Sequence, residues 1–535
     1  MSGVDQNSHQ APTLWHPLRT PTFRNLLIAD LASDIGTFIQ GVGAAWLMVS
    51  LHAGPLYIAL TQTASALPFF LLAVPAGVIG DIADRRKLIL FAEIWMACVA
   101  VVLAALAIAG RLSPVLLLIL TFAFAAGDAF ESPAWRAALP ELVPNEDLPP
   151  ASALNGIEFN FARAVGPALG GVVIALAGIS TTFAINAVSS IGVIVVVARW
   201  QEKPRRRTGP RETMGGATAA VIRYVRYSPA LRAILIRSGA VMFFASGLLA
   251  LLPSVAHDVS KRPTSYGFLL GCFGVGAVLG GLAMQRVRDR CSTEQVVSGG
   301  VLLFGLCTLA AGLLHVLPML GLSMLTAGAA WIVFVSFFNV IVLNQTPDWV
   351  RARVLAVSML VFQGAMAAGS AAWGWLATRT DTRIALLWAG AGTIAATALG
   401  LFLKLPDAPV DVTPWVHWRL PTILNRESSG DGIEMGPILV TVEYDVAPEQ
   451  ETEFLESIHG YERVRRRDGA YRWGVFRDLE HPNRYVETFL TASWAEHVRQ
   501  HERAIHADRA VEERVYSHVR GKPTVRHLGY VETEL

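Results

Sequence analysis

Charged residues and cysteines are both scarce in this sequence of 535 residues. Only 16% of the residues are charged, 53% are hydrophobic, and the mean hydropathy is +0.44. Soluble proteins carry about 25% charged residues, so the composition argues against an ordinary soluble chain. The four cysteines form no CxxC pair, which argues against a disulfide framework or a cysteine-bound zinc ion. The sequence has no GxxxxGK[ST] loop, which argues against ATP-driven activity.

The shortage of charge belongs to one part of the chain. Residues 1–404 carry 28 basic and 19 acidic side chains, whereas the much shorter segment 405–535 carries 16 basic and 23 acidic ones. We interpret the first part as a body embedded in a lipid bilayer and the second as a separate, acidic domain. No nucleic-acid partner is expected.

Long apolar runs dominate the first part. A helix needs about 20 apolar residues to cross a ~30 Å hydrocarbon core, and twelve runs in the sequence reach that length. They fall into two groups of six, 25–200 and 230–404, on either side of a polar linker at 201–229. We therefore predict an all-α membrane protein of two six-helix halves, preceded by a short N-terminal segment at 1–24. This is the plan of many secondary transporters.

Basic residues in the short loops set the expected orientation. Arg85, Arg86 and Lys87 follow the second span, and the triplet 205–207 follows the sixth. Because basic loops stay on the cytoplasmic side, we predict a multi-pass protein of the cell inner membrane with both termini, and the tail, in the cytoplasm.

The composition and patterning of the tail predict two parts. Residues 405–435, rich in Pro, Asp, Ser and Gly, are expected to form a linker, and residues 436–535 an α+β domain. The order β-α-β-β-α-β fits a ferredoxin-like sandwich. It resembles the dimeric domains of the antibiotic-biosynthesis-monooxygenase type, which implies a homodimer formed through this domain. The expected strands are Ile438–Tyr444, Tyr471–Arg477, Arg484–Leu490 and Val525–Val531, and the expected helices are Glu449–Arg467 and Ser493–Ser517.

Three histidines, His497, His501 and His506, fall on the second of these helices. The first two are four residues apart, a spacing that can hold a metal ion. Charged neighbours such as Arg499 and Glu502 favour an exposed, solvated helix instead. We therefore expect no metal, no cofactor and no catalytic residue.

The turn after the second span carries the most specific motif. It reads Gly77-x-x-Gly80-Asp81-x-x-Asp84-Arg85-Arg86. This resembles the loop 2–3 signature of the major facilitator superfamily. The commonest form of the signature has a basic residue where this chain has Ile82, and a glycine where this chain has Asp84. The Asp-Arg-Arg ending resembles the superfamily's transmembrane secretion effector branch, which includes enterobactin-exporter-like proteins.

The resemblance implies contacts that hold the two halves together when a transporter faces outward. Asp81 is expected to face the start of span 11 (352–377), near Val354, where the helix dipole favours an anion. Arg85 or Arg86 is expected to reach an acid at the cytoplasmic end of span 4 (113–134), either Asp128 or Glu131. The alternative is that the basic residues only anchor the topology.

A second motif lies in span 5, where Gly166, Pro167, Gly170 and Gly171 resemble the end of the superfamily's antiporter signature. Small residues let membrane helices pack closely. The resemblance further implies a bias towards export.

Charged residues inside the spans are candidates for proton coupling because they are costly in a membrane. Asp30 and Asp34 share one face of span 1, and Glu158 and Arg163 lie in span 5. An acid that alternates between protonated and charged forms can couple proton entry to substrate exit. The alternative is that Asp30 is solvated at the boundary and that Glu158 pairs with Arg163.

Taken together, these patterns predict a secondary active transporter that exports an amphipathic small molecule, such as a siderophore, a drug or a secondary metabolite. Proton antiport by alternating access is the expected mechanism, and the bilayer, the substrate and protons are the expected partners. The chain is not expected to be an enzyme. Two alternatives stay open: a membrane anchor whose monooxygenase-like tail binds or oxidises a metabolite, and an importer of the same fold.

Overall fold

The computed structural model describes residues 13–82, 84–200, 214–406, 410–415 and 436–530. By their contacts these residues form two compact units. One unit contains most of the apolar helices (1–207, 236–338 and 358–404). The other contains the tail domain together with residues 208–235 and 339–357, so each unit is considered by itself.

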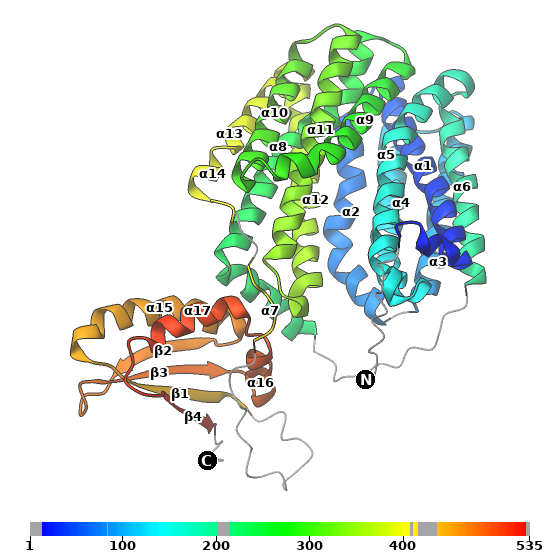
Figure 1. The fold of residues 1–535 in the computed structure, drawn as a ribbon. Coiled ribbons are helices and arrows are strands. Elements are labelled where there is room, and N and C mark those ends of the chain that lie inside the picture. Colours follow the sequence, from blue (N-terminus) through cyan, green and yellow to red (C-terminus); the bar gives the residue numbers. More distant parts are fainter. Residues whose placement is uncertain (1–12, 83, 201–213, 407–409, 416–435, 531–535) are drawn as a thin grey trace, which may run out of the picture. The chain divides into compact units, whose positions relative to one another are not determined.

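Within the described residues, twelve helices are long and apolar enough to cross a membrane, as the sequence predicts (Figure 1). Helices satisfy their own backbone hydrogen bonds, which is why apolar runs of this length adopt them in lipid. The first six are α1 (Pro21–Ser50), α2 (Pro55–Ile82), α3 (Arg85–Ile108), α4 (Pro114–Leu142), α5 (Leu148–Ala177) and α6 (Ile179–Arg199). The second six are α8 (Pro229–Val259), α9 (Pro263–Arg288), α10 (Thr293–Leu313), α11 (Leu317–Asn344), α12 (Asp348–Arg379) and α13 with α14 (Thr382–Ala396 and Leu399–Phe402).

Hydroxyl side chains mark the starts of several helices. Ser113 accepts a hydrogen bond from the Leu116 backbone at the start of α4. Ser292 forms a reciprocal capping box with Gln295 at the start of α10. Such caps satisfy backbone N–H groups that have no partner within the helix.

The helices of the first half pack as a bundle. Helix α1 lies against α5 and α6, and α4 lies against α2 and α3. The two halves meet along α5 and α9, which run side by side over much of their length (Figure 1).

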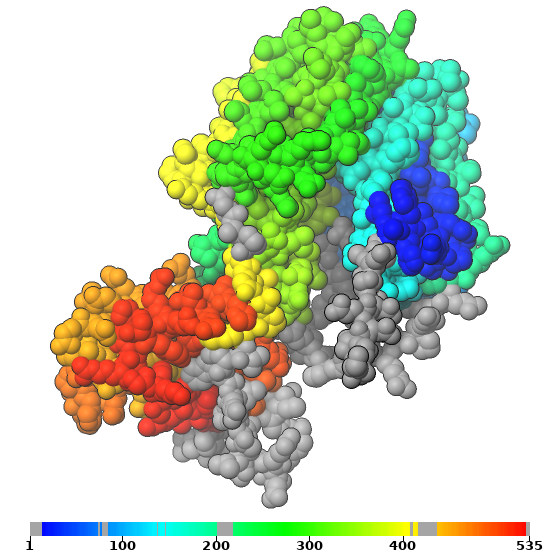
Figure 2. Space-filling model, in the orientation of Figure 1, coloured from blue at the N-terminus to red at the C-terminus, as the bar shows by residue number. Residues whose placement is uncertain are grey.

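The tail domain is a four-stranded antiparallel sheet in the order β2-β3-β1-β4. Helices α15 and α17 form a layer over one face (Figure 1), and Figure 2 shows them at the surface of the domain in orange and red. Phe454, Ile458 and Val515 from these helices fill the core against Val440 and Phe489 of the sheet. The elements are β1 (Ile438–Asp445), α15 (Glu451–Asp468), β2 (Arg472–Arg477), β3 (Arg484–Thr491), α16 (Trp494–Glu502), α17 (His506–Tyr516) and β4 (Thr524–Gly529).

The helix predicted over Ser493–Ser517 is broken into two. Ser493 caps α16 as expected, with its hydroxyl accepting from the Glu496 backbone at 3.2 Å. The chain then leaves the helix, because the Ala504 carbonyl accepts a hydrogen bond from the Trp415 backbone at 2.9 Å. This long-range contact competes with helix continuation and is invisible to local sequence patterns.

The predicted linker at 201–229 contains a further helix, α7 (Met214–Tyr227). This helix belongs to the same unit as the tail domain. Arg223 of α7 forms an ion pair with Glu496 at 2.9 Å. The Arg503 guanidinium lies 4.6 Å from the ring centre of Trp349, in the first turn of α12.

Candidate functional site

The motif loop between α2 and α3 is very short, because α2 runs to Ile82 and α3 begins at Arg85. The side chain of Asp84 accepts a hydrogen bond from the Lys87 backbone at 3.0 Å and so caps α3. The predictions for Gly77, Gly80 and Asp81 fall outside the described residues, since only the backbone of this end of α2 is described.

Arg85 and Arg86 both bind within the first half. Arg85, which is 8% exposed, pairs with Glu141 of α4 at 2.7 Å and donates to the Ala137 carbonyl. Arg86 donates to the Val197 carbonyl at 3.0 Å, at the end of α6, where a cation complements the helix dipole.

The predicted acidic partners of these arginines, Asp128 and Glu131, are therefore wrong. Helix α4 continues beyond the expected end of span 4 and carries Glu141 to the loop. Since a helix rises about 1.5 Å per residue, Glu131 lies roughly 15 Å further along α4. The Arg85–Glu141 pair joins neighbouring helices of one half.

Replacing Arg85 by alanine should destabilise the protein by roughly 1–3 kcal/mol, because Glu141, whose side chain is only 22% exposed, would lose the partner of its charge. Thermal unfolding in detergent measures the loss. Lys87→Ala is the matched control, since that side chain is 82% exposed and the same substitution should change little. Equal stability of the two variants would contradict a structural role for the pair.

Acidic side chains from four helices converge inside the first half. Asp34 interacts electrostatically with Asp128 and with Arg163. Glu93 and Glu131 are 3% and 8% exposed, and their carboxyl groups lie close enough to interact. Two buried carboxylates this close repel each other, so such a pair favours a state in which one of them is protonated. The cluster comprises Asp30 and Asp34 of α1, Glu93 of α3, Asp128 and Glu131 of α4, and Glu158 and Arg163 of α5.

The alternative pairing of Glu158 with Arg163 is wrong. The guanidinium of Arg163 lies 4.9 Å from the ring centre of Phe159. Glu158 is 7% exposed, and its Oε1 has no hydrogen-bond partner among the described residues. This carboxyl therefore belongs to the acidic cluster.

The glycine motif of α5 allows direct contact between the backbones of the two halves. A Cβ atom on Gly171 would lie 2.9 Å from the Cα of Gly267 in α9. A Cβ on Gly267 would lie 2.7 Å from the Cα of Gly171 and 2.9 Å from the Pro167 carbonyl oxygen. The other two glycines serve α1, because a Cβ on Gly166 would meet Phe38 and one on Gly170 would meet Ile39 and Val42.

A second contact between the halves joins α2 and α12. The Leu56 backbone donates to the Thr378 hydroxyl at 3.1 Å, and the Thr63 hydroxyl donates to the Ala367 carbonyl at 3.0 Å. Leu56 and Thr378 lie at the helix ends opposite the motif loop. The two halves are therefore closed against each other on that side.

Trp46 adds to this closed side. Its ring lies 5.8 Å from the ring of His257 and 6.4 Å from that of Tyr266, across the interface between the halves. No local pattern in the sequence indicates that these three rings meet, because they lie on three separate helices.

Sequence reasoning also missed a buried ion pair in the second half. Arg237 of α8 is 2% exposed and binds both carboxylate oxygens of Glu294, in α10, at 2.6 and 2.7 Å. An arginine inside an apolar run was the available signal, since such residues need a partner in the membrane.

Comparisons with known proteins agree on one family. The sequence profile of a family described as transmembrane secretion effector matches residues 12–534, which includes the tail domain. The multidrug efflux pump Tap of Mycobacterium tuberculosis is 26% identical over 418 residues, covering 76% of this chain and 94% of the pump. The enterobactin exporter EntS of Escherichia coli is 24% identical over 343 residues, covering 62% and 80%.

The solved structures support the same fold. A bacterial homologue of the human lysosomal transporter Spinster, in an inward-facing and occupied conformation, aligns with a TM-score of 0.60. The two sequences are 13% identical, and the alignment covers 72% of this chain and 97% of the homologue. The likeness shows the fold.

Proposed function

Since the chain belongs to the transmembrane secretion effector family of the major facilitator superfamily, we propose that it exports an amphipathic small molecule from the cytoplasm. A siderophore, a drug or a secondary metabolite fits this class of cargo. The similarity to a multidrug efflux pump and to an enterobactin exporter supports that choice. The basic loop residues that follow α2 support an inner-membrane protein with both termini in the cytoplasm.

Proton antiport is the proposed driving reaction. The observation that carries it is the burial of the Glu93 and Glu131 carboxyl groups beside each other. In the proposed reaction this pair holds one proton, and Asp34 and Glu158 add further acids to the same cluster. Release of this proton on one side of the membrane and uptake on the other would couple its movement to export.

Alternating access is the proposed mechanism. With the motif loop in the cytoplasm, the contacts of Trp46 and Leu56 lie on the external side of the membrane. The external side is then closed, so this conformation is the one that accepts cargo from the cytoplasm. The α5–α9 contact provides an interface about which the halves can rock.

Export is tested by comparing metabolites in cells with and without this protein. We expect at least one amphipathic compound to accumulate inside cells that lack the protein, and the concentration of that compound in the medium to fall. Depletion of a compound inside those cells would favour the importer instead. If no compound changes in either direction, the transport proposal fails.

We propose a ferredoxin-like fold for the tail domain, of the antibiotic-biosynthesis-monooxygenase type. The strand order β2-β3-β1-β4 and the helix layer on one face support it. A role in regulation is supported by the Arg223–Glu496 pair and by the packing of Arg503 on Trp349. These contacts tie the domain to α7 and to the first turn of α12, which belong to the same unit.

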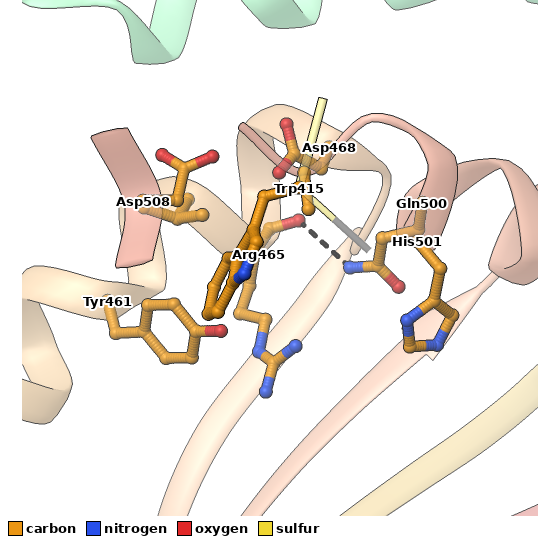
Figure 3. Close-up of a pocket in the computed structure, with 9 residues that line it drawn as sticks. Trp415, Tyr461, Arg465, Asp468, Gln500, His501 and Asp508 are labelled. Carbon is orange, nitrogen blue, oxygen red and sulfur yellow. Dashed lines mark hydrogen bonds between the residues drawn. The ribbon is translucent and has the colours of Figure 1, made fainter. Parts of the chain in front are cut away.

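An enzymatic role for the tail has less support. Its cavity measures about 20 Å³, far below the ~300–1,000 Å³ of small-molecule sites. Arg465 and Tyr461 occupy one part of it, and Gln500 donates a hydrogen bond to the Arg465 carbonyl across it (Figure 3). The lining residues are Trp415, Tyr461, Val464, Arg465, Asp468, Gln500, His501, Ala504 and Asp508.

A homodimer through the open face of the sheet is proposed next. The strand register places Leu439 opposite both Leu490 and Leu528, and Phe476 opposite Val486, so these side chains share the face that α15 and α17 leave uncovered. Phe476 is 61% exposed and Leu528 is 49% exposed. A second copy of the same face would bury these apolar side chains.

Phe476→Glu should therefore weaken the dimer. Burying one phenylalanine contributes at least about 1.5 kcal/mol, and a symmetric dimer buries two, so the dissociation constant should rise roughly 100-fold. Light scattering on the full chain in detergent measures it. The control is Leu479→Glu, at a turn residue that is 94% exposed, which should leave the dimer intact. A monomeric unmodified protein would overturn the dimer.

A further inference from the structure

Three histidines from two elements of the tail domain come together. His497 and His501 lie one turn apart on α16, with their Nε2 atoms 3.1 Å apart. His527 comes from the edge strand β4, and one ring nitrogen from each histidine lies within 4.8 Å of the other two. His506 begins α17 instead, where its ring lies 6.3 Å from that of Trp415.

We propose that His497, His501 and His527 bind one divalent transition-metal ion of the zinc class. Imidazole nitrogen suits zinc, copper and nickel. In a tetrahedral zinc site the ligand nitrogens lie about 2.0–2.1 Å from the ion, and so roughly 3.4 Å from each other. The 3.1 Å separation on α16 is close to that distance. A small rotation of the His527 side chain would bring its nitrogen into range.

The surroundings of His497 match those of a metal ligand. Its Nδ1 lies 3.3 Å from Oε1 of Gln500, an acceptor that would hold the proton on Nδ1 and leave the Nε2 lone pair free for an ion. His497 is 2% exposed, so its ring is held in place by the packing around it.

His527 supplies an independent reason for a ligand. Its Nε2 is buried and has no hydrogen-bond partner among the described residues. Leaving such a polar atom unpaired costs about 1–3 kcal/mol. A hydrogen bond between His497 and His501 explains the approach of those two rings but leaves His527 without a role. An ion bound to all three accounts for both observations.

Aromatic rings pack against the buried part of the cluster. The Trp494 ring lies 5.5 Å from the ring of His497 and 5.6 Å from that of His527, and the Phe489 ring lies 6.5 Å from that of His497. A low-dielectric shell of this kind strengthens metal–ligand bonds and limits access by water. Three protein ligands would leave one tetrahedral position for water or another small donor.

The test uses the full chain, purified in detergent with an affinity tag that contains no histidine and stripped with a chelator. Cobalt(II) is the probe, because its visible absorption reports tetrahedral coordination, and zinc is then added in competition. We expect one cobalt ion per chain, displaced by one zinc ion. His497→Ala, His501→Ala and His527→Ala should each weaken binding by about 100-fold or more, beyond the ~10-fold expected for Gln500→Ala.

His481→Ala is the matched control, since its side chain is 60% exposed in the turn between β2 and β3 and should not affect binding. His527 is only half-buried on an edge strand, so His527→Ala keeps the test valid if the variants on α16 fail to fold. The proposal is overturned if the unmodified protein binds no cobalt. It is also overturned if folded His527→Ala binds cobalt as tightly as the His481→Ala control.

Discussion

Replacing Glu131 by glutamine should lower proton-driven export by about 100-fold, the lower range of what a positioned proton-transfer group contributes. Glutamine keeps the size of the buried side chain beside Glu93, but it cannot bind or release a proton. Movement of cargo down its own gradient should persist, because the bundle keeps its shape. Proteoliposomes with an imposed proton gradient, loaded with the compound found in the metabolite comparison, separate the two rates.

A readout without cargo complements this measurement. The infrared carbonyl stretch of a protonated buried carboxyl should be present in the unmodified protein and reduced in Glu131→Gln. Glu146→Gln provides the control, because Glu146 is exposed in the loop after α4 and the substitution is identical. If both Glu93→Gln and Glu131→Gln export against the cargo gradient at the normal rate, this carboxyl pair does not couple protons to transport.

The fold followed from the sequence wherever a local property determined it. Each span needs only its own apolar length, so the twelve helices could be predicted one by one. Their ends were harder to place. Helix α12 begins at Asp348, and its first turns contain Arg351 and Arg353. These charged turns precede the apolar run. Hydropathy does not register such turns, although they continue the same helix.

The residues of the candidate site were predictable only in part. Asp30, Asp34 and Glu158 could be selected because any acid in an apolar run is costly. The partner of Arg85 could not, since choosing Glu141 over Asp128 required the length of α4 and its packing on α3. The association of His527 with α16 depends on the sheet register, which follows from long-range pairing rather than from spacing.

A methyl group at Gly267 should shift the protein towards the state that is open on the side opposite the motif loop. The new Cβ would lie 2.7 Å from the Cα of Gly171, so α5 and α9 must move apart at that end. Overpacking of this kind costs about 1–3 kcal/mol. If separation of the two halves relieves this steric cost, the equilibrium between the closed state and the state open on that side shifts roughly 5- to 150-fold.

A disulfide between Leu56→Cys and Thr378→Cys reports the closed side, because the two residues already share a hydrogen bond at 3.1 Å. The four native cysteines are first replaced by serine. Gly267→Ala should reduce the yield of this cross-link and slow export, since the closed state becomes rarer. Gly281→Ala, on the same helix with no atom within 4 Å of the added carbon, should instead gain up to about 1 kcal/mol of helix stability and cross-link normally. Equal yields in the two variants would mean that the α5–α9 contact moves without affecting the closed side, and that the halves do not rock about this interface.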